Sequence, residues 1–207
     1  TGYSDPARPG QDVQVDLPPG AEPDPTEATG PSRFGGFRAG FVAVAPLLVG
    51  VAPFGLVAGA TPVAYGLGAD AAVGFSVIMF AGASQLASIE VLGAGGSVLA
   101  AVLTACTINL RLILYSASCS PYLRRLAPAR RMVMAYLLTD EAYALSIVRW
   151  SEQGSEAQDP PTLRGRWTFY MGAAASMWAT WQISTLVGIL VGSALPSGVR
   201  LDVIAPL

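Results

Sequence analysis

The apolar residues of this sequence are gathered into segments of about 20 residues, the length that a helix needs to cross the hydrocarbon core of a bilayer. They do not follow the short alternating pattern that is typical of strands. Of the 207 residues, 52% are hydrophobic and 13% are charged, whereas soluble domains carry about 25% charged residues. The sequence therefore predicts an all-α, polytopic membrane protein that is embedded in a lipid bilayer.

The acidic residues are concentrated at the N-terminus. Residues 1–32 contain six acids and one arginine among many prolines and glycines. A segment of this composition cannot bury enough apolar surface to fold. We therefore expect a disordered Pro/acid-rich tail over residues 1–33 and a transmembrane domain over residues 34–207. The last residues, LDVIAPL, resemble the start of a further apolar segment, so we expect the protein to continue beyond them.

Residue types that the sequence lacks exclude several functions. Histidine is absent, which excludes a Ser–His protease and removes the commonest metal ligand. Asp140 is the only aspartate inside an apolar segment, so a paired-aspartate protease is not indicated. Cys106 and Cys119 would lie about 20 Å apart on one helix, too far for a disulfide. We expect no enzyme, no cofactor, no metal site and, without a basic patch, no nucleic-acid partner.

The apolar segments and their interruptions indicate about five to seven membrane segments, some of them broken or re-entrant. Glycines and prolines lie inside several of the segments, as membrane helices tolerate. The segments cover residues 41–60 with a continuation to 69, 71–92, 98–119, 132–150 and 167–195.

The first segment is too long for one straight helix and too short for two, and it contains Pro46, Pro53 and Pro62. A proline removes one hydrogen bond of the helix. A break at residues 53–55, Pro-Phe-Gly, would free backbone carbonyls in the membrane, which is tolerated only against protein or a wet cavity. A kinked packing helix is an equally good interpretation.

Polar side chains inside the second and third segments are candidates for a solute pathway. Gln85 places an amide in the membrane, where it would either bond a neighbouring helix or contact a substrate. Ser84 and the neighbouring small residues favour close helix packing. Thr104 and Thr107 lie on the same helix face as Arg111 and predict a polar seam along that helix.

Three charges lie where a lipid-facing helix could not carry them: Arg111, Asp140 and Glu141. A charge at the centre of a bilayer costs about 2.5–3.5 kcal/mol, so it is kept mainly when it is paired or faces water. We expect one carboxylate to pair with Arg111 and the other to face the pathway. A second interpretation places both acids at the N-terminus of a half-helix that Thr139 caps. Snorkelling to an interface is the alternative for Arg111.

Arginine counts give a conflicting membrane orientation. Residues 121–131, PYLRRLAPARR, contain four arginines, and Arg33 and Arg38 precede the first segment. The positive-inside rule places both regions in the cytoplasm, which requires an even number of crossings between them. Three segments intervene, so either the first one turns back on itself, or one of the three is re-entrant, or one of the two arginine counts is misleading.

Four short motifs resemble those of the AzlC-type branched-chain amino acid permeases, the large subunits of bacterial exporters linked to azaleucine resistance. They are PFG at 53–55, FAGASQ at 80–85, NLR at 109–111 with Tyr115 following, and TDEAY at 139–143. The resemblance covers about residues 34–207. It implies a multi-pass protein of the bacterial inner membrane that exports leucine, isoleucine or valine with a small AzlD-type membrane subunit.

The resemblance and the polar residues together suggest a mechanism. Backbone near residues 53–55 or Arg111 would bind the substrate carboxylate, and Asp140 or Glu141 its ammonium group. Adjacent carboxylates favour proton uptake by one of them, which would couple export to the proton gradient. The open alternatives are a transporter or channel for another small solute and a structural membrane subunit. The candidate substrate-binding or pathway residues are Pro53, Phe54, Gly55, Ser84, Gln85, Asn109, Arg111, Asp140 and Glu141, the last two also being the proton-coupling candidates.

Overall fold

The computed structural model describes residues 36–194. Within this range all regular structure is helical, as the sequence predicts: seven α-helices and one short 3-10 helix. The predicted tail over residues 1–33 and the C-terminal LDVIAPL lie outside the described residues. In chain order the elements are α1 (Phe37–Ala64), α2 (Ala69–Ile78), α3 (Gly82–Gly93), α4 (Val98–Cys119), η2 (Ser120–Leu123), α5 (Pro128–Tyr136), α6 (Asp140–Gln153) and α7 (Pro160–Ala194).

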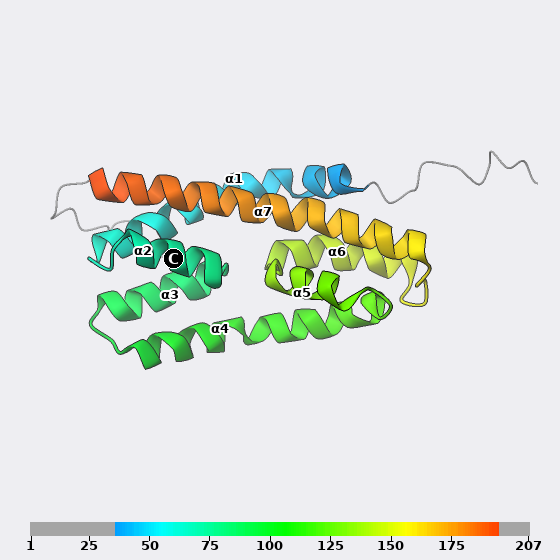
Figure 1. Cartoon of the computed structure of the whole chain (residues 1–207), viewed down its shortest axis with the longest axis horizontal. Coiled ribbons are helices and arrows are strands. Elements are labelled where there is room, and N and C mark those ends of the chain that lie inside the picture. The colour runs from blue at the N-terminus through cyan, green and yellow to red at the C-terminus, as the bar shows by residue number, and fades with distance from the viewer. Residues whose placement is uncertain (1–35, 195–207) are drawn as a thin grey trace, which may run out of the picture. The chain divides into compact units, whose positions relative to one another are not determined.

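Three helices in the described part of the chain are long and apolar enough to cross a membrane: α1, α4 continued by η2, and α7. Helices α1 and α7 run side by side in the same direction, and α4 runs in the opposite direction (Figure 1). These spans confirm the polytopic membrane fold.

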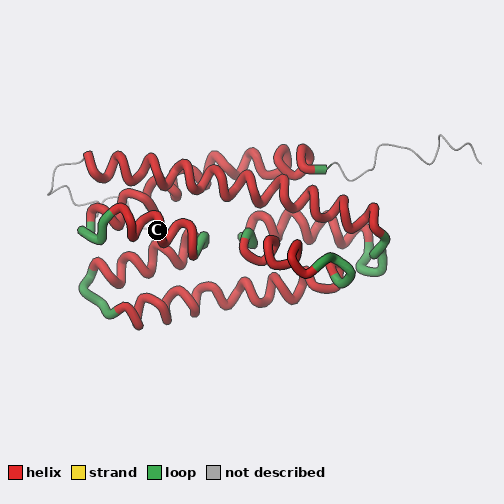
Figure 2. The backbone as a smooth tube through the Cα atoms, viewed as in Figure 1, coloured by secondary structure: helices red, strands yellow, loops and turns green. Residues whose placement is uncertain are grey.

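The remaining four helices form two hairpins that enter from opposite ends and stop half-way. Helices α2 and α3 have 10 and 12 residues, and α5 and α6 have 9 and 14, so each is too short to cross a bilayer. Each hairpin returns to the end from which it came, and the interruption between its helices lies near the middle of the long spans (Figure 2). The tips meet there, since the Tyr136 hydroxyl donates to the Val77 carbonyl at 2.7 Å.

The structure corrects two sequence-based expectations. The first apolar segment does not turn back or break at residues 53–55, because α1 is continuous over 28 residues with three prolines inside it. Proline is tolerated in a membrane helix when neighbouring helices pack against the interrupted turns, and α7 packs along α1. The interruption lies instead at residues 79–81, inside the second segment that was expected to be one block.

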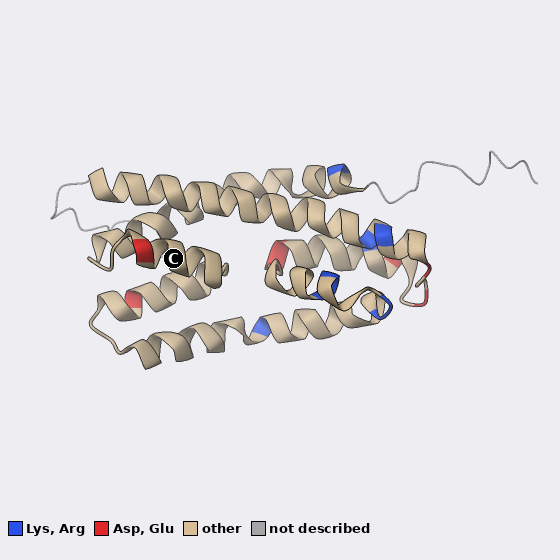
Figure 3. Ribbon diagram, viewed as in Figure 1, with Lys and Arg blue, Asp and Glu red and all other residues tan. Residues whose placement is uncertain are grey.

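The re-entrant hairpins remove the conflict over orientation. Because α2–α3 returns to its own end, only α1 and α4 cross between the first arginines and the basic loop, an even number. Every described arginine except Arg111 lies in the first turns of α1, α5 or α7, in the η2–α5 connection, or in the second half of α6, all toward one end (Figure 3). The positive-inside rule places this arginine-rich end in the cytoplasm.

The order of the elements repeats in inverted direction. A span followed by a half-way hairpin occurs as α1 with α2–α3, and again, running the other way, as α4 with α5–α6 (Figure 1). Inverted repeats of this kind place interrupted helices from both halves near the middle of the bilayer. The two hairpin tips are therefore the place in this fold where backbone groups are free to contact a solute.

Glycines bring α1 and α7 into backbone contact. A Cβ atom added to Gly59 would collide with the Thr185 carbonyl oxygen, and one added to Gly188 would collide with the Leu56 carbonyl oxygen. Gly59 belongs to the run GLVAG on α1 and Gly188 to the run GILVG on α7, both of the G-x-x-x-G type that lets membrane helices approach closely. Helices α1 and α7 thus form the rigid part of the scaffold.

A buried arginine fastens the arginine-rich end. Arg166 on α7 is 1% exposed, and its three nitrogens donate to Gln153 Oε1 at 2.9 Å, the Tyr122 carbonyl at 2.7 Å and the Gly154 carbonyl at 2.8 Å. The guanidinium also lies 5.4 Å from the Tyr122 ring centre. One side chain therefore ties α7 to η2 and to the end of α6.

We expect Arg166→Lys to destabilise the protein. Lysine cannot reproduce the planar fork, so at least one of the three acceptors would lose its donor, at about 1–3 kcal/mol for each buried group left unpaired. The thermal midpoint of the purified protein in detergent should fall. The control Arg164→Lys, two residues away on α7 and exposed, should leave the midpoint unchanged. Equal midpoints for the two variants would contradict this role of Arg166.

Candidate functional site

A cavity of about 440 Å³ lies where the two hairpin tips meet the middle of α1, α4 and α7. We refer to it as the central cavity. Its volume is in the range of small-molecule sites, about 300–1,000 Å³. The lining residues are Leu47, Gly50, Val51, Phe54, Phe80, Ala81, Gly82, Ala83, Arg111, Leu112, Leu138, Thr139, Asp140, Glu141, Met177 and Trp181.

The interruption before α3 is shaped by two residues of the FAGASQ motif, Phe80 and Gly82. Phe80 has φ of 38°, a conformation that is uncommon for a bulky residue and typical of strained functional sites. Its ring is buried, with its centre 6.5 Å from that of Trp181. Gly82 begins α3 under the same indole, and a Cβ there would lie 2.9 Å from Trp181 Cη2. The motif therefore turns the chain and holds the start of α3 against α7.

The interruption before α6 is a capped helix start, as one of the two sequence interpretations proposed. Thr139 is extended and its side chain accepts from the Ala142 amide at 3.2 Å. Asp140 and Glu141 follow in the first turn. Carboxylates at this position are stabilised by the partial positive charge of the helix N-terminus. The acids of the TDEAY motif are thus held at the tip of the second hairpin.

An ion pair links the NLR and TDEAY motifs across the cavity wall. Arg111 Nη1 lies 2.6 Å from Asp140 Oδ2, and the two side chains are 36% and 39% exposed. Next to the pair, the rings of Tyr115 and Tyr143 are stacked with centres 4.3 Å apart and an angle of 8° between their planes. The pair explains how both charges are kept at membrane depth, and the stack fixes α4 against α6.

The central cavity collects both signs of charge on a mostly apolar wall. The N-termini of α3 and α6 both reach it, and each contributes free amide groups and a partial positive charge. Arg111 adds a full positive charge, and Asp140 and Glu141 add two negative ones. The arrangement suits a small zwitterion with an apolar side chain better than an ion of one sign.

Comparison with known proteins identifies the family. Residues 46–195, most of the chain, match the family described as AzlC protein. The chain belongs to the AzlC family. It is 29% identical over 188 residues to the inner membrane protein YgaZ of Escherichia coli, a match that covers 87% of this chain and 68% of YgaZ. The AzlC chain is thus a multi-pass membrane protein homologous to an inner membrane protein.

A second relative comes from an archaeon. Over 159 residues this AzlC chain is 29% identical to an uncharacterized membrane protein of Archaeoglobus fulgidus, covering 77% of the chain and 64% of that protein. The chain therefore spans about two thirds of the length of both relatives. No solved structure matches it.

Four of the nine candidate residues line the central cavity of this AzlC protein: Phe54, Arg111, Asp140 and Glu141. Phe54 lies on the face of continuous α1 that looks toward the hairpin tips. The Asp140–Arg111 pairing agrees with the expectation that one carboxylate would pair with Arg111. Glu141 also lines the cavity, and among the described residues the carboxylate that pairs with Arg111 is that of Asp140.

The other five candidates lie outside the cavity lining. Gly55 is buried against Ser184 of α7, with an added Cβ 2.6 Å from the serine Cβ, so it serves helix packing. The Ser84 hydroxyl donates to the Ala81 carbonyl at 3.0 Å and supports the first turn of α3. The remaining three are Pro53, which is exposed, and Gln85 and Asn109, which carry buried polar atoms without a hydrogen-bond partner.

The predicted polar seam of α4 is also not part of the cavity. The hydroxyls of Thr104 and Thr107 donate to the carbonyls of Ala100 and Leu103 in their own helix, at 2.9 and 2.8 Å. Only Arg111 of the three seam residues reaches the central cavity. The helical spacing correctly groups these three residues on one face of α4, but it does not predict which of them contacts the hairpin tips.

Sequence reasoning missed several lining residues. Trp181 lies in a long apolar segment, where a tryptophan is typical of packing or of the membrane interface, yet it borders the cavity and supports Gly82. Met177 and Leu138 are ordinary apolar residues in long apolar runs, and nothing in the sequence distinguishes them. Gly82 carries only a weak signal, because glycines inside apolar segments mark interrupted membrane helices and also occur in continuous ones.

Proposed function

We propose that this chain is the large subunit of a proton-coupled exporter of branched-chain amino acids and that the central cavity binds the substrate. The observation that supports it best is the convergence of two half-helix N-termini and the Arg111–Asp140 pair on one cavity of about 440 Å³. Interrupted helices whose N-termini face an anionic substrate group at mid-membrane are a recurring transporter design. Membership of the AzlC family points to the same substrate class.

The three parts of a branched-chain amino acid each find a matching group. Free amides at the start of α3, around Gly82, and the Arg111 guanidinium bind the carboxylate. Asp140 or Glu141 binds the ammonium group. Apolar side chains of α1 and α7, such as Phe54 and Met177, contact the branched side chain. Arg111 is already paired with Asp140. Substrate binding therefore replaces this ion pair by two, one between Arg111 and the substrate carboxylate and one between an acid and the substrate ammonium group.

Proton coupling follows from that exchange. A protonated carboxylate no longer holds an ammonium group, so proton uptake by Glu141 or Asp140 releases the substrate, and proton loss restores the site. Glu141 is the acid that is not committed to the Arg111 pair, and we assign the transported proton to it. Asp140 then positions Arg111 in both states.

Efflux from preloaded cells tests the function. Cells lacking endogenous branched-chain exporters are loaded with leucine, isoleucine and valine and transformed with this gene, with the gene of the small AzlD-type subunit, or with both. We expect rapid efflux only with both genes, and inhibition when a protonophore collapses the gradient. Unchanged efflux of all three amino acids, with both proteins present in the membrane, would overturn the proposal and leave transport of another solute.

We expect Glu141→Gln to slow proton-driven export by about 10- to 100-fold, the value of one hydrogen bond to a charged group. Substrate exchange without a gradient should persist with a raised KM, because glutamine keeps the shape of the site but, like the protonated acid, holds the ammonium group weakly. Glu90→Gln is the matched control, since Glu90 is an exposed carboxylate on α3 that lines no described cavity. Gradient-driven export by the Glu141 variant at the rate of the control would contradict the assignment.

A further inference from the structure

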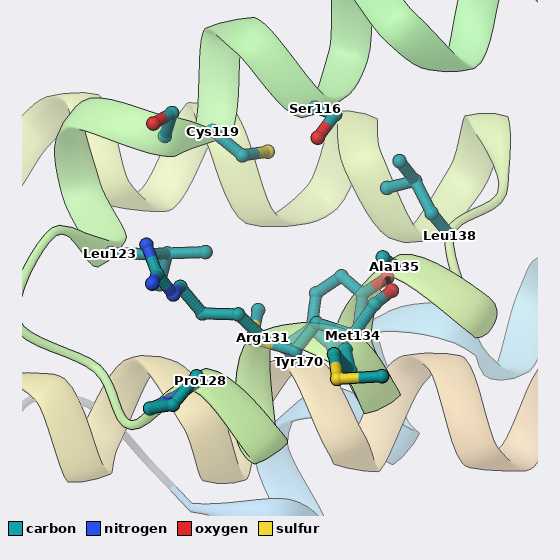
Figure 4. A pocket seen from close by; sticks show the side chains of 11 residues that line it. Ser116, Cys119, Leu123, Pro128, Arg131, Met134, Ala135, Leu138 and Tyr170 are labelled. Atoms are coloured by element: carbon teal, nitrogen blue, oxygen red, sulfur yellow. Dashed lines mark hydrogen bonds between the residues drawn. The ribbon is translucent and has the colours of Figure 1, made fainter.

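A second cavity, of about 370 Å³, lies toward the arginine-rich end, between the end of α4 and the start of the second hairpin. We call it the vestibule. Ser116 and Cys119 project into it from α4, and Arg131, Met134 and Tyr170 border the opposite side (Figure 4). Arg131 is exposed, so the vestibule has an open rim on the side where the positive-inside rule places the cytoplasm.

The vestibule and the central cavity have one lining residue in common. Leu138 lines both, and the two cavities share no other lining residue. It is 8% exposed and directly precedes the cap residue Thr139, at the tip of the second hairpin. Its neighbour Leu137, equally buried, lines neither cavity. Leu138 is therefore placed to act as a partition that a small movement of the hairpin tip would open.

The chemistry of the vestibule matches the same class of molecule as the central cavity. The Arg131 guanidinium supplies a positive charge at the rim, the hydroxyls of Ser116 and Ser120 supply hydrogen-bonding groups, and Leu123 and Met134 supply apolar surface. The Tyr170 hydroxyl is already engaged, since it donates to the Met134 carbonyl at 2.7 Å, and it holds α5 against α7. A carboxylate with a short apolar side chain fits this set.

We propose that the vestibule is the cytoplasmic waiting site of the substrate, where Arg131 receives its carboxylate, and that Leu138 is the partition through which the substrate passes into the central cavity. This inference rests on the proposed export of branched-chain amino acids for the identity of the ligand. The position of the partition rests only on the two cavities and their shared residue.

Thiol labelling tests the vestibule in otherwise native protein. Cys119 lines it, whereas Cys106 is exposed on another part of α4, so a Cys106→Ala protein carries one reporter. A membrane-impermeant maleimide should label Cys119 in inside-out vesicles and not in right-side-out vesicles, and saturating L-leucine should slow labelling several-fold. Labelling from the opposite side, or no protection in a protein that exports leucine, would overturn the proposal.

A second reporter tests the partition. Ala83→Cys, in a protein with both native cysteines replaced by alanine, places a thiol in the central cavity. In inside-out vesicles, Leu138→Ala should speed its labelling at least about tenfold, equivalent to lowering a barrier by 1.4 kcal/mol, and Leu137→Ala should not. Equal rates in the two backgrounds would overturn the partition. If Leu138→Ala fails to fold, the leucine protection of Cys119 still decides the proposal.

Transport kinetics separate the role of Arg131 in the vestibule from the role of the central cavity. Arg131→Gln should raise the KM for leucine about fivefold, the scale of one exposed ion pair, with kcat unchanged. Arg125→Gln, in the η2–α5 connection and lining neither cavity, should leave both constants unchanged. If leucine protects no reporter and is not exported, but Leu138→Ala still opens the central cavity, the proposed substrate fails and the partition stands.

Discussion

Gly59→Ala is expected to destabilise the protein by about 1–3 kcal/mol, the usual cost of adding a methylene group to a packed interior. In an unpacked helix the same change would stabilise by about 1 kcal/mol, because alanine is the better helix former. At Gly59 the new Cβ would collide with the Thr185 carbonyl oxygen and lie 3.0 Å from the Ile189 nitrogen. Both neighbours are backbone atoms, so the two helices themselves must separate.

The control is the same substitution in a membrane helix without a neighbour at that point. A Cβ added to Gly74 of α2 meets nothing within 4 Å, so Gly74→Ala should be neutral or slightly stabilising. Thermal unfolding of the purified variants in one detergent measures both, with a shift of about 2–4 °C for each kcal/mol in a chain of this size. A lower thermal midpoint for Gly59→Ala together with an unchanged or higher one for Gly74→Ala would support backbone contact between α1 and α7. A stabilising effect of Gly59→Ala would contradict it.

Under the proposed transport function, contact between α1 and α7 matters because one part of the molecule has to stay fixed while another moves. The two helices carry one wall of the central cavity, including Phe54 and Met177. The hydrogen bonds at the hairpin tips, Tyr136–Val77 and Trp178–Tyr136, are exposed. Behind the tips, buried hydrogen bonds fix the hairpins to α7, from Ser76 to Thr185 and from Tyr170 to Met134. Movement of a tip, rather than of α1 or α7, is thus the change that the packing permits at lowest cost.

Several features of the fold and site follow from the sequence because each depends on one strong local energy term. The length of the apolar segments predicts the spans α1, α4 and α7, since hydrocarbon thickness sets helix length. The cost of an unpaired charge at membrane depth predicts that Arg111 meets a carboxylate. The preference of threonine for helix starts predicts the cap at Thr139. These three inferences lead to the second hairpin tip and to half of the site.

The first hairpin could not be predicted in the same way. Its interruption follows Ile78 and Met79, apolar residues with good helix or strand propensity, and no proline is present there. The turn exists because Gly82 has no side chain and leaves room for the Trp181 ring, and because packing holds Phe80 at positive φ. Both contacts join residues about 100 positions apart, so they depend on tertiary structure that local preferences do not encode. Conversely, Pro53 suggests a break in α1, but α1 is continuous because α7 packs along it.

The ion pair gives the second large expected effect, because its structural role and its proposed transport role can be separated. Asp140→Asn and Arg111→Gln each remove one partner of the pair and leave the other charge without it, while the double variant removes both charges. An unpaired charge costs about 2.5–3.5 kcal/mol at the bilayer centre, and less here because both side chains are more than one third exposed. We therefore expect each single variant to lose about 2 kcal/mol of stability and the double variant to recover most of it.

In the double variant, we expect stability to recover but transport to stay slow. If Arg111 and Asp140 bind the carboxylate and order the ammonium site, the double variant lacks both groups and should export leucine about 10- to 100-fold more slowly than wild type, as each single variant does. Thermal midpoints in detergent and efflux from preloaded cells measure the two roles in one double-mutant cycle. A double variant that is both stable and active would show that the pair serves only to neutralise two charges, and the substrate site would then have to be built from the α3 N-terminus and Glu141.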